Sequence, residues 1–286
     1  MKTSLECIPC FLRQSLEASR MITDDENVHE QVLKTLLKHL QTVSFNYCPP
    51  RISRDVHDII RSITKSSDPY REIKDQSNKM AKKRYPYLKQ ILANSDDPLL
   101  AAIKIAIVGN VIDFGTMNRF KVDDMIDIII EKDIDSQSYS QFKQALKNTN
   151  NILYLADNAG EIYFDKILIE KLVEQNKHVT YVVKANPIIN DATIEDAQTA
   201  GINQLATVME GDKGQDVSAP GILLYYASDE FLDHFNTAEM VIAKGQGNYE
   251  SLSDSSRKIF FLLMVKCPLV AHHLGVEMAK PVFKVI

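Results

Sequence analysis

The sequence predicts an α/β fold in which an N-terminal helical bundle is followed by a doubly wound, mostly parallel sheet. Three observations support this prediction. Apolar residues in the first half recur at spacings of three and four, strand-like alternation is absent there, and the second half alternates short β-branched runs with helical stretches. The pattern changes near residues 147–151, so we expect a helical domain over residues 1–148 and an α/β domain over 149–286.

Helices account for the first half. Apolar side chains at helical spacing are Leu5, Phe11, Leu12 and Leu16, then Val32, Leu33, Leu36, Leu37 and Leu40, and then Ile59, Ile60 and Ile63. A further helix is predicted from Pro98, which follows the capping residues Asp96 and Asp97, and it is expected to stop near Gly115.

Strands are predicted in the second half from short apolar runs rich in β-branched residues. These runs are 151–156, 178–183, 205–209, 239–245 and 282–286, and a helix is expected between the first two, over 161–176. This alternation favours a parallel sheet with helices on both faces.

Charge and hydropathy exclude several classes of protein. The chain of 286 residues has 33 basic and 38 acidic side chains, and its basic cluster around Lys79, Lys82, Lys83 and Arg84 is typical of a solvated helix face, so we expect no nucleic-acid partner. The longest apolar stretch, 259–265, is far shorter than the ~20 residues that span a bilayer. With no signal-peptide pattern at the N-terminus, we expect a cytoplasmic protein that does not enter the membrane.

Four cysteines are present, Cys7, Cys10, Cys48 and Cys267, and a chain of this length needs no disulfides, so reduced thiols are expected. Cys7 and Cys10 form a C-x-x-C pair. Buried structural thiols, an accessory metal or redox pair, and a catalytic role all remain open for it.

Polar residues gather where the predicted strands end. Asp157 and Asn158 follow the first strand, Lys184 and Asp191 follow the second, and Lys244 ends the fourth. In parallel α/β sheets ligands bind at this edge, and carboxylate and amide oxygens suit Mg²⁺ or Mn²⁺. Each loop alone is also a normal turn or helix cap, but together the residue types predict a divalent metal with an anionic ligand.

Motifs along nearly the whole chain resemble those of the metal-dependent damage-control phosphatase family, formerly a domain of unknown function. They are the C-x-x-C pair, "GNVIDFG" at 109–115, "DNAGE" at 157–161, "KANPIINDAT" at 184–193, "GDKGQD" at 211–216, "KGQGNYE" at 244–250 and "KCPLVAHHLGV" at 266–276. The C-x-x-C pair points to the archaeal and bacterial branch. The resemblance implies hydrolysis of small phosphate monoesters, such as sugar phosphates and damaged phosphometabolites, with Mg²⁺, Mn²⁺, Co²⁺ or Ni²⁺ as cofactor.

The resemblance also implies roles for individual residues. The metal ligands fall on Asp157, Asn158 and Asp191, which with the phosphate-facing Lys244 make up the expected catalytic set. The contribution of the helical half falls on Asn110 and Asp113. The residue types themselves add Lys184 and Asn186 as possible phosphate contacts, and Glu161, where a helix is expected to start, completes the set expected to contact the substrate. On a continuous helix, Asn110 and Asp113 lie three apart and share a face.

The expected mechanism is direct attack by a metal-activated water, because "DNAGE" lacks the second Asp of a D-x-D nucleophile motif. Whether a phospho-enzyme forms first is left open. Two alternatives remain: an S-adenosylmethionine-dependent carboxyl methyltransferase, as eukaryotic relatives were once described, and a non-enzymatic metal- or redox-binding protein that uses Cys7 and Cys10. The sequence does not predict the physiological substrate, the preferred metal or the oligomeric state.

Overall fold

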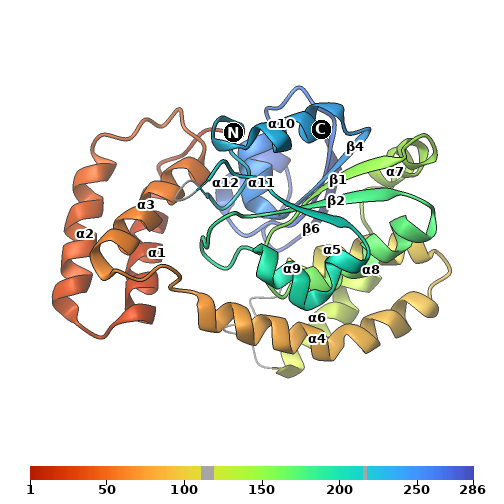
Figure 1. Cartoon of the computed structure of the whole chain (residues 1–286), viewed down its shortest axis with the longest axis horizontal. Helices are drawn as coiled ribbons and strands as arrows, with labels where there is room; N and C mark the ends of the chain where they lie inside the picture. The colour runs from red at the N-terminus through yellow and green to blue at the C-terminus, as the bar shows by residue number, and fades with distance from the viewer. Residues whose placement is uncertain (111–118, 215–217) are drawn as a thin grey trace.

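The computed structural model describes residues 1–110, 119–214 and 218–286 of the chain (Figure 1). In this view the first three helices lie together at the left, and a long helix runs along the bottom beneath a central sheet. In the described part of the chain, no helix combines the length and apolar character that crossing a bilayer requires.

Helices α1 (Cys7–Ile22), α2 (Glu26–Leu40) and α3 (Pro49–Thr64) pack around an apolar cluster of their own. The cluster includes Phe11, Val32, Leu36, Ile52 and Val56, which come from all three helices. Asp25 caps α2 by accepting a hydrogen bond from the Asn27 amide, and two prolines occupy the first turn of α3, where the missing N–H costs nothing.

The next four helices, in contrast, contribute to an apolar cluster that they share with the sheet. They are α4 (Arg71–Ala93), α5 (Pro98–Gly109), α6 (Arg119–Glu131) and α7 (Ser136–Lys147). Asp97 caps α5, which is almost wholly apolar and buried and packs against the first helix of the α/β region. One apolar cluster contains side chains from these helices and from the sheet. Apolar packing therefore does not separate the part of the chain before residue 148 from the part after it. The domain boundary at residue 148 remains a prediction.

The sheet has six strands in the order β3-β2-β1-β4-β5-β6. They are β1 (Asn151–Leu155), β2 (His178–Val183), β3 (Thr207–Glu210), β4 (Met240–Lys244), β5 (Ile259–Met264) and β6 (Pro281–Val285). All neighbours pair in parallel except β5 and β6, which are antiparallel. This confirms the predicted α/β fold with a mostly parallel sheet and adds β5, a strand that the sequence patterns did not predict.

Successive side chains of each strand point to opposite faces of the sheet, so each face carries its own apolar cluster. Helices cover both of these apolar faces. Ile152 and Tyr154 of β1 belong to the cluster shared with α4–α7, whereas Leu153 and Leu155 belong to the other. On the first face lie α8 (Ile162–Glu174) and α9 (Ile194–Ala200). On the second face lie α10 (Asp229–Thr237), α11 (Gly245–Leu252) and α12 (Pro268–Leu274). Two short 3₁₀ turns are η1 (Ile202–Gln204) and η2 (Leu224–Tyr226).

Candidate functional site

The strand order reverses between β1 and β4, which lie side by side at the centre of the sheet. In such sheets the loops that leave the carboxyl ends of the two central strands diverge and open a crevice for ligands. Asp157 and Asn158 follow β1, and Gly245 follows β4. The first polar loop predicted from the sequence therefore lies at this crevice.

Backbone hydrogen bonds join the loop after β1 to the loop after β2. Asn158 and Asp191 form an antiparallel bridge, the Ala192 N–H donates to the Asp157 carbonyl at 2.8 Å, and the Ala159 N–H donates to the Asn190 carbonyl at 2.8 Å. The structure therefore holds Asp157, Asn158 and Asp191, the three predicted metal ligands, in two directly paired loops.

The Asp157 carboxylate is held on one side by two amides. Its Oδ2 accepts hydrogen bonds from Asn110 Nδ2 at 2.6 Å and from Asn158 Nδ2 at 2.7 Å. On another side lies Gly245, where an added Cβ would come within 2.0 Å of Oδ2. Among the described residues, no group donates a hydrogen bond to Asp157 Oδ1. One oxygen is thus fixed by the protein, and the other is available to a ligand.

Two charged groups beside Asp157 are buried without hydrogen-bond partners. Within the described ranges, neither Asp191 Oδ2 nor Lys184 Nζ makes a hydrogen bond, and the two atoms lie 3.8 Å apart. Burial raises the pKa of Asp191 well above its usual range. Burial, followed by the negative charge of Glu161, raises the pKa of Asp157 to about 7. Buried polar groups without hydrogen bonds call for an explanation, and a bound ion or ligand is one such explanation.

This donor set fits a hard divalent cation. Two carboxylates and one amide supply oxygens, the ligands that Mg²⁺ and Mn²⁺ prefer. The Asn158 Nδ2 atom donates to both Asp157 and Glu161, so its Oδ1 atom is left for coordination. Nowhere in residues 1–110, 119–214 and 218–286 do three His, Cys, Asp or Glu side chains form a metal-binding group. With three oxygens from the protein, a cation held here would keep coordination positions for water and substrate.

Lys244 is fully buried, and its ammonium is bound by two carboxylates. Nζ lies 2.5 Å from both Glu161 Oε1 and Asp165 Oδ1, and Asp165 also accepts hydrogen bonds from the hydroxyls of Tyr154 and Tyr181. Burial lowers the pKa of Lys244, but the two carboxylates outweigh it and raise that pKa above its ordinary value. The lysine thus ties α8 to β4 behind the crevice.

Glu161, expected to contact substrate, has both carboxylate oxygens occupied. Oε1 binds Lys244, and Oε2 accepts from Asn110 and Asn158 at 3.1 Å each. Its position at the start of α8 agrees with the helix start expected there.

Asn110 follows the last residue of α5 and is buried at the same crevice. Besides donating to Asp157 and Glu161, its Oδ1 accepts from the Met264 N–H at 2.9 Å, so it links α5, the β1 loop and the end of β5. The helix predicted to run to Gly115 ends at Gly109. Asp113 lies outside the described residues.

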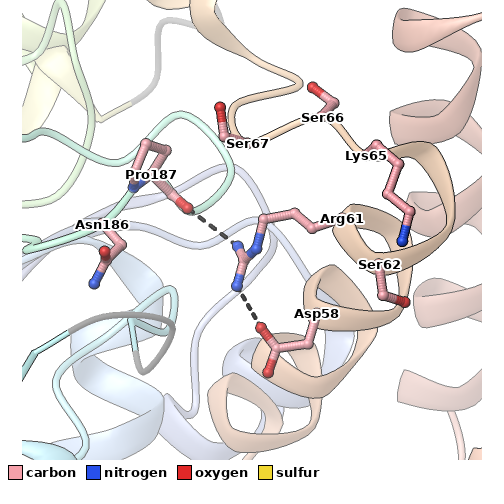
Figure 2. Close-up of a pocket in the computed structure, with 8 residues that line it drawn as sticks. All are labelled: Asp58, Arg61, Ser62, Lys65, Ser66, Ser67, Asn186 and Pro187. Atoms are coloured by element: carbon pink, nitrogen blue, oxygen red, sulfur yellow. Dashed lines mark hydrogen bonds and ion pairs between the residues drawn. The ribbon is translucent and has the colours of Figure 1, made fainter.

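Asn186 faces a different cavity, of about 570 Å³, between α3 and the loop after β2 (Figure 2). Figure 2 shows Arg61 reaching from α3 to Asp58 and to the Pro187 carbonyl beside Asn186. The Asn186 side chain donates to the Gly214 carbonyl at 2.8 Å, and its N–H donates to Ser218 Oγ at 3.0 Å. Its contacts tie two loops together.

Lys266 was not among the predicted site residues. It follows β5, its charge lowers the pKa of Asp157, and its side chain is exposed. The sequence carried a signal for it, because the lysine comes at the end of the apolar run 259–265, but that run was not predicted as a strand.

Comparison with known proteins identifies relatives along the whole chain. A family model described as a damage-control phosphatase ARMT1-like domain matches residues 3–282. A protein named damage-control phosphatase from Archaeoglobus fulgidus is 34% identical over 291 residues, covering 100% of both chains. Damage-control phosphatase PH1575 from Pyrococcus horikoshii is 36% identical over 283 residues, covering 96% of this chain and 95% of the relative.

A solved structure shares the same fold. The crystal structure of a DUF89 family protein, PH1575 from Pyrococcus horikoshii, superposes with a TM-score of 0.90 at 34% sequence identity. The match covers 99% of this chain and 98% of that chain.

Proposed function

This chain belongs to the ARMT1-like damage-control phosphatase family, and from that premise we propose that it is a metal-dependent phosphatase acting on phosphate monoesters of small metabolites. The candidate ions are Mg²⁺, Mn²⁺, Co²⁺ and Ni²⁺. The proposal assigns the metal to Asp157, Asn158 and Asp191, as the sequence predicts.

One observation supports this assignment most directly. Asp191 Oδ2 and Lys184 Nζ are buried, lie 3.8 Å apart and make no hydrogen bond to any described residue. A buried carboxylate oxygen without a partner costs about 1–3 kcal/mol or more, and a cation on the one group with a phosphate on the other would satisfy both.

A divalent ion bound there would polarise a phosphoryl oxygen and make water more acidic. The residues of the chain hold and orient the groups around it. Asn110 and Glu161 fix Asp157 and Asn158 through their hydrogen bonds, and Lys244 neutralises Glu161 from behind. We therefore assign Lys244 and Glu161 to positioning rather than to direct contact with phosphate.

Stabilisation of the negative charge on the transferred phosphoryl group is assigned to two other lysines. Lys184 carries a buried ammonium that makes no hydrogen bond to a described residue and lies 3.8 Å from Asp191 Oδ2, and Lys266 places an exposed ammonium within electrostatic reach of Asp157. Helix α11 begins at Gly245, so the positive end of its dipole adds to the same field. Preorganised positive groups of this kind stabilise charge that develops in phosphoryl transfer.

Water is the nucleophile in this proposal. Its oxygen forms a bond to phosphorus, the bond from phosphorus to the ester oxygen breaks, and the proton from water ends on the departing alcohol. Asp157 is assigned to metal binding rather than to nucleophilic attack, because the segment "DNAGE" lacks the second Asp of a D-x-D nucleophile motif.

Neither alternative from the sequence is favoured. The loop after β1 carries a buried carboxylate, which opposes the carboxylate of an S-adenosylmethionine cofactor, and the named relatives are phosphatases. The four cysteines are free thiols, and among the described residues they form no group that could hold a metal.

The test uses chelator-treated protein. Phosphate release from p-nitrophenyl phosphate and a panel of sugar phosphates is measured after each divalent ion is added, and Mn²⁺ binding is measured by calorimetry. Asp157→Asn and Asp191→Asn are expected to lose Mn²⁺ binding and to lower kcat at least about 100-fold, because each removes a charged ligand.

Asp233→Asn, an exposed carboxylate on α10, is the control and should match the wild type in both assays. Full activity in the presence of chelator would refute the metal requirement. Full activity of Asp157→Asn would refute the site.

A further inference from the structure

A cavity of about 560 Å³ lies between α1 and the carboxyl edge of the sheet. Its wall on the α1 side includes Cys10 and Arg13, and its wall on the sheet side includes Ile189, Gly247 and Lys266. Pockets of this size, within the usual range of about 300–1,000 Å³, bind small metabolites.

The sheet-side wall is built from the loops that also carry the candidate metal site. Gly247 lies two residues after Gly245, which packs against the Asp157 carboxylate, and Ile189 lies two residues before Asp191. Lys266 follows β5, which pairs with β4 in the sheet, and it also lines the cavity. A phosphate held at Asp157 and Asp191 would therefore have its ester group at the mouth of this cavity.

Arg13 presents an unpaired cation to the cavity. Among the residues that the structure describes, no carboxylate lies within ion-pairing distance of its guanidinium, whose contact is the Cys10 thiol at 3.8 Å. Arg61 on α3, in contrast, is paired with Asp58.

Acidic groups on the cavity wall leave Arg13 unneutralised. The buried Glu250 carboxyl accepts a hydrogen bond from Gln246, and burial raises its pKa to about 7, which removes much of its negative charge near neutral pH. The carboxylate of Glu6 is exposed to solvent and forms no ion pair with any described residue.

We propose that this cavity binds the leaving group of the phosphate ester and that Arg13 recognises a second anionic group on it. The inference rests on the proposed phosphatase function and narrows its substrates to phosphomonoesters that carry an additional carboxylate or phosphate. A guanidinium suits either anion because its planar N–H groups bind two oxygens at once. Arg13 is a specificity-determining residue for the same reaction.

Matched pairs of esters test this inference and separate the two sources of charge. Glucose 6-phosphate is compared with 6-phosphogluconate, and fructose 6-phosphate with fructose 1,6-bisphosphate, in the metal-loaded enzyme. The wild type is expected to favour the doubly acidic member of at least one pair. Arg13→Ala should lower kcat/KM for that member about 10- to 100-fold, mainly through KM, and leave the neutral member unchanged.

Two further variants control for charge and position. Arg13→Lys keeps the charge but loses the fork, so it should retain part of the preference. Arg20→Ala removes an exposed arginine from the same helix, outside the cavity lining, and should behave as the wild type.

Protection of a thiol gives a readout that needs no turnover. In chelator-treated protein, 6-phosphogluconate should slow the alkylation of Cys10 by iodoacetamide, whereas Cys48, which does not line the cavity, should react at an unchanged rate. Arg13→Ala should lose this protection.

The outcomes distinguish the two proposals. If the wild type hydrolyses no ester with any metal, the phosphatase function fails. If it hydrolyses esters with the same selectivity as Arg13→Ala, and Cys10 is not protected, only the inference about Arg13 and the cavity is overturned.

Discussion

Replacing Gly245 with alanine tests how tightly the candidate metal site is built. Gly245 has a φ of +79°, and an added Cβ would lie 2.0 Å from Asp157 Oδ2 and 2.1 Å from its Cγ. Real Cβ contacts essentially never fall below 3.0 Å, so the carboxylate or the start of α11 must move by about 1 Å. Metal–ligand distances hold to within about 0.2 Å, so this shift removes Asp157 from any productive coordination.

Two effects of the substitution can be separated by a matched control. The left-handed conformation costs a non-glycine residue about 1–2 kcal/mol, and Gly275→Ala carries the same cost because its φ is +67°. A Cβ at Gly275, however, meets nothing within 4 Å. Both variants should therefore lose a similar amount of free energy of unfolding from backbone strain, whereas only Gly245→Ala should also displace Asp157, the proposed metal ligand.

The assays are urea unfolding in chelator and Mn²⁺ binding by calorimetry. Gly275→Ala should lose about 1–2 kcal/mol in free energy of unfolding and bind Mn²⁺ as the wild type does. Gly245→Ala should lose at least as much stability and at least about 10- to 100-fold in Mn²⁺ affinity. Wild-type Mn²⁺ affinity in Gly245→Ala would refute the packing argument and the assignment of Asp157 as a ligand.

Three other substitutions give separate predictions. Lys244→Met should lower the free energy of unfolding by about 3–5 kcal/mol in urea titrations, because it leaves the buried carboxylates of Glu161 and Asp165 without their cation. A loss below about 1 kcal/mol would contradict the buried ion pair. Lys266→Met should leave stability within about 0.5 kcal/mol of the wild type but lower kcat/KM about 100-fold in the phosphatase assay, and an unchanged kcat/KM would exclude Lys266 from phosphate binding. Burial, with the charge of Arg61, lowers the pKa of His57 from 6.5 to about 3. As the pH drops from 6.5 towards 3, His57 is protonated in the unfolded chain but not in the folded one, so the free energy of unfolding falls. His57→Gln should remove about 2 kcal/mol of the stability lost between pH 7 and pH 5, and equal losses in both proteins would count against a buried neutral imidazole.

The sequence predicts the place of the site better than the contacts within it. Asp157, Asn158 and Asp191 could be placed together because parallel strands end at one edge, a rule that depends only on strand order. The direction of a side chain at that edge depends on the pleat and on its neighbours. Lys244 therefore matched the pattern of a phosphate ligand, yet it points to Glu161 and is buried.

Missed features have a similar physical origin. Strand β5 contains a single β-branched residue, Ile259, so it does not match the β-branched runs from which strands were predicted, and Lys266 after it went unassigned for the same reason. The helical spacing of apolar residues shows that one face of a helix is buried, but it does not identify the element that packs against that face. The spacing therefore predicted the N-terminal helices but not that α1–α3 form their own apolar cluster while α4–α7 share one with the sheet.

The separate apolar core of α1–α3 has a consequence for how such enzymes diversify. The proposed reactive groups come from loops of the sheet, whereas Arg13, the proposed specificity residue, belongs to a unit with its own packing. Substitutions in two such units combine almost additively because they share few contacts. On the two proposals together, evolution can change metabolite preference through the first three helices while the hydrolytic site is inherited unchanged.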